Sequence, residues 1–204
     1  FSLVVGAFDI NVLGRYLELG GSYQRLGSTN SFVVWAHDPR FLDQRLFAGI
    51  DAALTNRMRY TFDEAGDVAG AHLRERLQLR LFVNGELERW VSLGAGAAIQ
   101  SDEFSYELIP EEAQEIQEAA GGLPNSTRAL ILSGSARIGR IDADSYVYEG
   151  LRYLQSISHS NPAWGANTRF TQVDGELKGF LKLPWKSNFG ARLGLGATDS
   201  DEIE

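Results

Sequence analysis

The residue types that most often hydrolyse substrates or bind metals are scattered along this chain. The three histidines, His37, His72 and His159, lie on separate segments, and none has the spacing of a His-Glu-x-x-His zinc motif. Ser133 and Ser135 lack the Gly-x-Ser-x-Gly pattern of a nucleophile elbow. The chain has no cysteine, which excludes disulfides, thiolate nucleophiles and thiolate zinc sites. The sequence therefore favours a protein that is not an enzyme, and it predicts no catalytic residue, metal or cofactor.

The remaining candidates for function are charged residues spaced by even numbers of positions, which would place them on one face of a strand. Arg74, Arg76 and Arg80 form such a row. One interpretation is a cationic stripe that guides an acidic chain or holds a plug or loop in place. The other is charge pairing across neighbouring strands, with acidic partners at Asp51, Glu88, Asp174 or Glu176. The residues predicted to face an interior are Asp51, Arg74, Arg76, Arg80, Glu176, Lys178 and Arg192.

Elements with a two-residue period must position these charges. Between Arg45 and Thr55 every even position is aliphatic and every charge is at an odd position, a pattern typical of a β-strand. The period and the turn residues predict ten strands, at residues 2–8, 15–26, 31–38, 44–60, 71–83, 87–101, 127–140, 145–158, 168–183 and 188–198. One short helix is predicted at residues 110–120, because proline starts it, acidic residues fill its first turn and two glycines end it.

The connections between these strands indicate how the sheet is used. Asn84-Gly85, between two alternating runs, predicts a two-residue hairpin, and Ile141–Asp144 predicts another short connection. Longer connections at Thr61–Gly70, Asp102–Ser126 and His159–Asn167 mostly alternate with the short ones, as in transmembrane β-barrels. Most predicted strands also reach the ~9–11 residues that cross a bilayer at a tilt. A soluble all-β domain is the alternative, because its strands also alternate between apolar and polar residues.

Composition narrows the classes of partner. The chain has 204 residues, a formal net charge of −8 and 44% apolar residues. It lacks the broad cationic surface of a nucleic-acid-binding protein, so no nucleic-acid partner is predicted. No apolar run approaches the ~18 residues of a membrane-spanning helix.

Two turn motifs carry a resemblance to a known family. Asn11, Leu13 and Gly14 precede the second predicted strand, and Asp38, Pro39 and Phe41 follow the third. With the order and spacing of the strands, they resemble the barrel domain of the outer-membrane assembly-factor superfamily, the bacterial surface antigen family of BamA- and TamA-like proteins. The chain departs from the family pattern because it contains no Arg-Gly-Phe motif.

The resemblance implies an antiparallel transmembrane β-barrel in the bacterial outer membrane, with the helix in an extracellular loop. Residues 1–204 would be a single barrel domain or a fragment of one, without periplasmic transport domains, that holds about ten of sixteen strands. The implied function is insertion or translocation of other polypeptides. The implied partners are the lipid bilayer, client polypeptides, and missing barrel strands or a partner subunit. The alternative is a passive channel, or a membrane anchor for a separate passenger domain.

Overall fold

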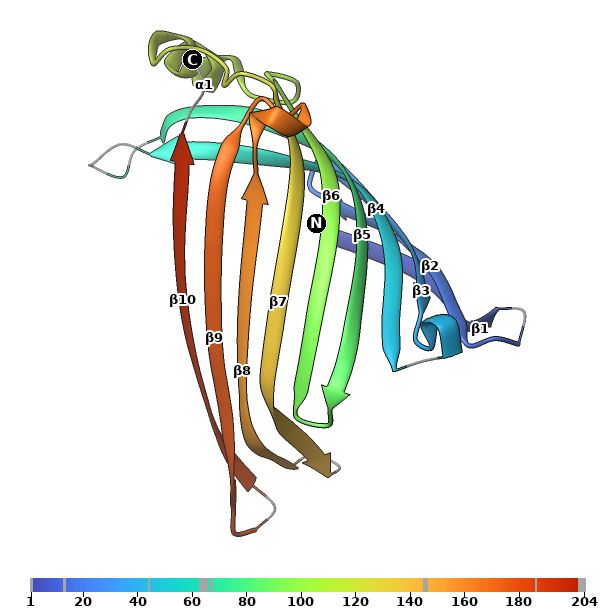
Figure 1. The fold of residues 1–204 in the computed structure, drawn as a ribbon. Helices are drawn as coiled ribbons and strands as arrows, with labels where there is room; N and C mark the ends of the chain where they lie inside the picture. The colour runs from blue at the N-terminus through green and yellow to red at the C-terminus, as the bar shows by residue number, and fades with distance from the viewer. Residues whose placement is uncertain are drawn as a thin grey trace. The chain divides into compact units, whose positions relative to one another are not determined.

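The computed structural model describes residues 2–12, 14–43, 45–62, 66, 68–144, 147–185 and 187–201. They form one ten-stranded sheet in which the strands follow one another in chain order (Figure 1). The strands are β1 (Ser2–Val12), β2 (Leu17–Leu26), β3 (Thr29–Asp38), β4 (Leu46–Phe62), β5 (Val68–Glu88), β6 (Val91–Ser105), β7 (Thr127–Asp144), β8 (Val147–Ser160), β9 (Arg169–Leu183) and β10 (Ser187–Asp201). The helix α1 (Glu111–Ala119) lies between β6 and β7, and two short 3-10 turns are at Phe41–Asp43 and Pro162–Trp164.

The two-residue period of the sequence explains the two unlike faces of the strands. In the antiparallel pair β8–β9, Tyr153 lies opposite Leu177, and the neighbouring residue Arg152 lies opposite Lys178. Successive side chains point to opposite faces of a strand, so one face of this pair is apolar and the other is basic. The predicted all-β class, the ten strands and the single short helix are confirmed.

Several predicted strand ends are wrong because pairing continues beyond the predicted turns. β1 extends to Val12 instead of ending at residue 8, and Val12 still pairs with Leu17 of β2. Residues 141–144 were predicted to connect two strands, but they belong to β7. Asp142 pairs there with Glu149 of β8.

The hairpin turn predicted at Asn84-Gly85 is also wrong. β5 continues through both residues to Glu88, and the chain reverses at residues 89–90. Gly85 lacks the positive φ that an Asn-Gly turn requires. The Asn84 side chain instead fills the space that Gly94 leaves on β6. Packing between the strands therefore overrides the local turn preference.

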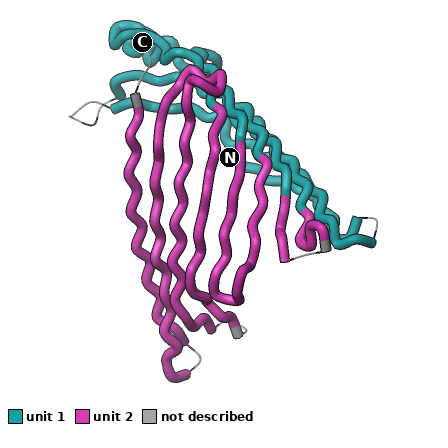
Figure 2. The backbone as a smooth tube through the Cα atoms, viewed as in Figure 1, with its two compact units in different colours: residues 1–37, 49–80, 98–129 teal, residues 38–48, 81–97, 130–204 magenta. Residues whose placement is uncertain are grey.

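The chain divides into two compact units, which are described separately (Figure 2). Unit 1 comprises residues 1–37, 49–80 and 98–129, and unit 2 comprises residues 38–48, 81–97 and 130–204. Unit 1 contains β1, β2, α1 and parts of β3 to β7. Within it, the Gln114 side chain of α1 donates a hydrogen bond to the carbonyl oxygen of Ile109 at 2.7 Å. Unit 2 contains β8, β9, β10 and most of β7.

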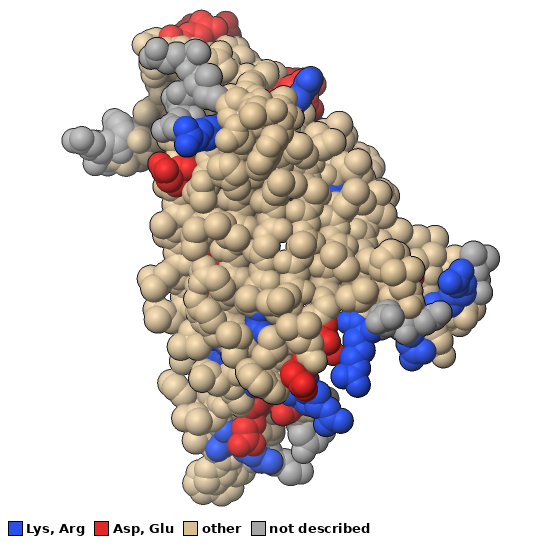
Figure 3. All heavy atoms as spheres, in the orientation of Figure 1, with Lys and Arg blue, Asp and Glu red and all other residues tan. Residues whose placement is uncertain are grey.

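Large apolar side chains are exposed along the strands of both units. In unit 2, Leu181, Leu193 and Leu195 expose 66%, 59% and 73% of their surface. In the described part of the chain, the buried apolar residues are few: Ala71, Leu73, Ala98, Ile109, Ala129, Val147 and Ala166. On the surface drawn in Figure 3, long stretches along the strands are uncharged, and charged atoms gather toward strand ends. So much exposed apolar surface marks a face that contacts another apolar phase or protein.

None of the helices in the described residues is both long and apolar enough to cross a membrane.

Gly139 on β7 is a position where the backbone requires glycine. Its φ is +92°, and a Cβ there would collide with the carbonyl oxygen of Leu151 on β8. We expect Gly139→Ala to destabilise the folded protein by about 1–3 kcal/mol or more, because it adds backbone strain and a clash. The urea midpoint of the full-length protein in detergent measures this. Gly134→Ala is the control, since its Cβ would lie 3.6 Å from Ile157. Equal losses for the two variants would contradict the prediction.

Candidate functional site: charged faces and open sheet edges

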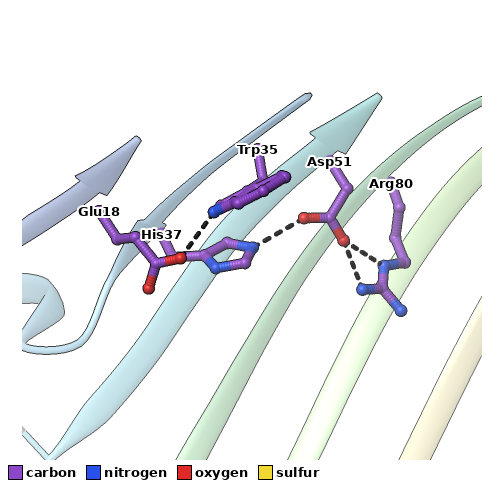
Figure 4. A network of polar contacts seen from close by, with 5 residues as sticks. All are labelled: Glu18, Trp35, His37, Asp51 and Arg80. Carbon is purple, nitrogen blue, oxygen red and sulfur yellow. Dashed lines mark hydrogen bonds and ion pairs between the residues drawn. The ribbon is translucent and has the colours of Figure 1, made fainter. Parts of the chain in front are cut away.

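The first charged cluster lies on one face of unit 1 and joins strands β2 to β5 (Figure 4). Asp51 Oδ1 lies 2.7 Å from His37 Nε2, and Asp51 Oδ2 accepts two hydrogen bonds from the Arg80 guanidinium, one of them 2.9 Å long from Nε. Beside them, Trp35 Nε1 donates to Glu18 Oε1 at 2.6 Å. These side chains define what we call the polar face of unit 1. Of the two interpretations of the arginine row, charge pairing with an acidic residue on a neighbouring strand therefore holds for Arg80, whose partner is Asp51.

Asp51 gives a first test of how much this network stabilises the protein. Its side chain is 18% exposed and binds two cationic or polar partners, His37 and Arg80. We expect Asp51→Asn to lower the free energy of unfolding by about 1–2 kcal/mol, because charge-assisted hydrogen bonds are weakened. The control is Asp142→Asn, whose ion pair with Arg140 is largely exposed and is expected to contribute little. If both variants unfold at the same urea concentration as the unmodified protein, the network has no such role.

The second cluster of unit 1 centres on Asp102 of β6. Its carboxylate accepts two hydrogen bonds from Arg76, at 2.7 Å from Nε and 2.8 Å from the second nitrogen. Gln100 and Thr127 also donate to Asp102 Oδ2, at 3.1 Å and 3.4 Å. Asp102 is only 5% exposed. This bidentate, nearly buried pair is of the kind whose disruption is costly, because a charge is then left without a partner.

Arg74 lies two residues from Arg76 on the same face of β5. It interacts electrostatically with Arg57, Arg59, Arg76 and Asp102. Arg74 and Arg76 thus lie close together, but of the two only Arg76 forms an ion pair with Asp102.

Unit 2 holds the other predicted charged residues in a cluster of its own. The Glu176 carboxylate receives one hydrogen bond from Arg152 on β8, at 3.4 Å, and pairs with Arg192 on β10. Lys178 lies opposite Arg152 of β8 on one side and opposite Arg192 of β10 on the other. Its Nζ also lies 5.3 Å from the centre of the Phe180 ring. Glu176 therefore offsets part of a strongly basic surface, the polar face of unit 2.

The partners that the sequence did not predict are His37, Asp102 and Arg152. Asp102 was missed for two reasons. The sequence placed it in the connection at residues 102–126, but β6 continues to Ser105. The predicted turn at Asn84-Gly85 also gave β5 and β6 the wrong register. A hairpin at Asn84-Gly85 would place Arg76 opposite Leu93, whereas the observed register brings it to Asp102. The polar residues at even positions of β6, Gln100 and Asp102, were a signal that this strand continues the polar face.

The first predicted turn motif lies at the β1–β2 turn. The backbone N–H of Gly14 donates to the carbonyl oxygen of Asn11 at 3.0 Å, and the Asn11 side chain accepts from the N–H of Tyr16 at 3.1 Å. Leu13 lies outside the described residues. Asn11 therefore closes this turn through both its backbone and its side chain.

The second predicted motif lies at the end of β3 in unit 2. Asp38 accepts a hydrogen bond from the N–H of Arg40 at 2.9 Å, across Pro39. Phe41 follows as the first residue of a 3-10 turn and is 40% exposed. The arrangement is an aspartate-closed turn, and a functional role for these residues remains a prediction.

The strand order leaves β1 and β10 as the edge strands of the sheet. Every residue of β1 from Ser2 to Asn11 is exposed. Its exposed large apolar residues are Leu3, Val4, Val5, Phe8 and Ile10. Because they include neighbouring positions, apolar residues lie on both faces of β1, although Asp9 and Asn11 make the end of one face polar. A long, exposed and apolar edge presents a template for pairing with another strand.

No set of three or more His, Asp or Glu residues within the described ranges is arranged to hold a metal ion. What the site offers is electrostatic surface on the polar faces and strand pairing at the edges.

Comparisons with known proteins identify the fold. No protein-family model matches the chain, and no curated protein matches it. The structure is similar to that of BamA from Haemophilus ducreyi lacking POTRA domains 1–3, with a TM-score of 0.73 and 16% sequence identity. The match covers 98% of this chain and 38% of that chain. This chain therefore has the fold of a BamA barrel and spans less than half the length of the matched protein.

Proposed function

We propose that this chain is part of a bacterial outer-membrane β-barrel that inserts or translocates other polypeptides without catalysing a chemical reaction. The observation that carries the proposal is the BamA-like fold, which extends over 98% of the chain. Because a fold alone does not determine function, the proposal also rests on two further features: the polarity of the two sheet faces and the exposed edge strands.

The two faces of the sheet support residence in a membrane. Transmembrane barrels alternate apolar residues toward lipid with polar residues toward the lumen. In β9, Leu177 and Leu181 belong to the apolar face and Glu176 and Lys178 to the polar one. β9 has 15 residues, which exceeds the ~9–11 that a tilted strand needs to cross the hydrocarbon core. The bilayer is thus the partner that we propose for the apolar face.

The two edge strands support the proposal that further strands complete the barrel. We propose that residues 1–204 belong to one barrel domain of about sixteen strands, and that the others pair with β1 and β10. Pairing at an edge is also the means by which such a barrel would handle a client. An incoming strand gains main-chain hydrogen bonds at an unpaired edge.

The test is an insertion assay with the full-length protein in liposomes of phosphatidylethanolamine and phosphatidylglycerol. An unfolded eight-stranded client barrel is added, and its folding is followed by heat-modifiable gel migration and protease protection. We expect the client to fold faster than in empty liposomes and in liposomes that hold a passive barrel. Equal folding rates in all three would contradict an insertion function.

A passive channel is the second candidate, and one feature of unit 2 favours it. Unit 2 has a hollow of about 1220 Å³ that is open to solvent and is lined in part by Arg45, Glu86 and Arg137. Ion conductance across a planar bilayer without any acceleration of client folding would establish this function instead. An upstream passenger domain that stays active at the cell surface would indicate a membrane anchor.

A further inference from the structure

Four arginines of unit 1 gather on its polar face beside a single carboxylate. Arg57 and Arg59 belong to β4, Arg74 and Arg76 to β5, and Asp102 to β6. Arg74 is repelled by the other three guanidinium groups and attracted by Asp102. We call the four residues Arg57, Arg59, Arg74 and Arg76 the arginine cluster.

Hydrogen bonds between β4 and β5 fit a register in which two of these arginines, Arg57 and Arg74, lie opposite each other. One is a backbone bond, from the N–H of Glu86 to the carbonyl oxygen of Arg45, the residue before β4, at 3.1 Å. Asp51 bonds to Arg80 across the β4–β5 pair. Arg57 is six residues after Asp51 on β4, and Arg74 is six residues before Arg80 on β5. An even number of steps keeps both residues on the polar face. The hydrogen bond between Asn56 and Glu75, 2.9 Å long, fits the same register. Like charges directly opposite each other are destabilising, so this arrangement needs a compensating gain.

Within the described residues, an ion pair with a carboxylate is formed by only one member of the arginine cluster, Arg76. Asp102 already accepts two hydrogen bonds from Arg76, one from Gln100 and one from Thr127. Glu75 lies between Arg74 and Arg76 in sequence but on the opposite face, where it bonds to Asn56. Among the described residues, no acidic side chain forms an ion pair with Arg57, Arg59 or Arg74.

We propose that the arginine cluster binds a phosphate-type oxyanion, either inorganic phosphate or the phosphate of a lipid headgroup. Guanidinium groups donate in forks that match the oxygens of phosphate. Adjacent strands lie about 4.8 Å apart and alternate residues about 7 Å apart, so the four side chains form a compact patch. Such a patch can surround one multivalent anion. An extended acidic peptide would instead require cations in a row along a groove.

The first experiment measures binding of inorganic phosphate to the full-length protein folded in dodecyl maltoside. Isothermal titration gives the dissociation constant, and thermal unfolding is compared in phosphate and in chloride of equal ionic strength. We expect phosphate to bind and to raise the unfolding temperature above that in chloride. In the double variant Arg57→Gln/Arg74→Gln, binding is expected to weaken about tenfold or more, because two charge-assisted donors are lost.

The stability of the double variant and a matched control variant distinguish loss of the binding site from misfolding. Without phosphate, the double variant is expected to be at least as stable as the unmodified protein, because the repulsion between Arg57 and Arg74 is removed. The matched control is Arg15→Gln, which removes a cation from the β1–β2 turn and should leave binding unchanged. Equal effects of phosphate and chloride, or phosphate binding that survives in the double variant, would overturn the proposal.

A second arm separates the sources of the phosphate group. The protein is titrated with mixed micelles that contain bisphosphorylated lipid A or its dephosphorylated form, and with an octaglutamate peptide. Tighter binding of the phosphorylated lipid than of inorganic phosphate identifies a headgroup site, and the reverse identifies a site for free phosphate. Both results require loss of binding in the double variant. If octaglutamate displaces phosphate at lower concentration than either, the cluster serves an acidic polypeptide and the proposal is wrong.

Discussion

Asp102→Ala is expected to lower the free energy of unfolding by about 3 kcal/mol, the lower end of the range for removing one partner of a buried ion pair, because Arg76 is 28% exposed. Asp102 is 5% exposed and accepts four hydrogen bonds, two of them from Arg76. Without it, Arg76 loses its bidentate partner and the nearby Arg74 loses the one carboxylate that attracts it. The stability is therefore lost for two reasons: the hydrogen-bond donors of Arg76 have no acceptor, and the positive charges of Arg74 and Arg76 have no nearby carboxylate.

Urea unfolding of the full-length protein in detergent measures this loss, with the slope checked to be unchanged between variants. Glu103→Ala is the matched control, because Glu103 is the neighbouring acidic residue and is exposed. It should change the free energy of unfolding by less than about 0.5 kcal/mol. A loss below about 1 kcal/mol for Asp102→Ala would show that the pair with Arg76 contributes little. If the phosphate proposal is right, phosphate should restore part of the lost stability.

A charge on the apolar face is expected to have the second large effect. Leu177 lies at the middle of β9, between Tyr153 on β8 and Leu193 on β10. If this face contacts lipid, Leu177→Arg should cost about 2–4 kcal/mol, the range for a basic residue near the bilayer midplane. The same substitution on the other face should be far milder. Leu154→Arg is on the polar face of unit 2, between Arg137 on β7 and Glu176 on β9. The new charge meets one like and one opposite charge, so the expected cost is less than about 1 kcal/mol.

Reversible unfolding from lipid vesicles compares the two arginine variants under one condition. The apolar-face variant should unfold at clearly lower urea, and the polar-face variant close to the unmodified protein. The opposite order would mean that the faces have been assigned the wrong way round. Equal and severe losses would mean that both leucines are packed in a protein core.

Much of the fold could be predicted from the sequence because its dominant signal is local. Alternation between residues such as Leu177 and Lys178 fixes both the strand and its two faces. The helix at Glu111–Ala119 was predicted within one residue at each end, because a proline before it and glycines after it limit it on both sides. These signals do not depend on knowledge of the neighbouring strand.

The register and the charged clusters could not be predicted as well, because they depend on pairs of strands. Asn84 lies in a strand because its side chain packs over Gly94, a contact that no local turn rule contains. That misplaced turn, with a predicted strand that ended at residue 101 instead of Ser105, kept Asp102 from being expected as the partner of Arg76. Asp51 and Arg80 were correctly given as a candidate pair, because both fall on charged positions of long alternating runs. Distances along the sequence alone do not show which acidic residue meets which arginine.

The most direct test of the central claim, that the apolar face of this sheet contacts lipid and the polar face contacts water, is a cysteine scan along β9. Residues 1–204 contain no cysteine, so each single substitution adds one labelling site to this chain, once any cysteine elsewhere in the full-length protein is replaced by serine. The labelled positions are Val173, Leu177 and Leu181 on one face and Asp174, Lys178 and Lys182 on the other. In vesicles with the full-length protein, labels on the first set should be quenched by a nitroxide lipid, and those on the second set by aqueous iodide. Labels on the first set that neither quencher reaches, in a protein that stays folded without lipid, would contradict the membrane barrel.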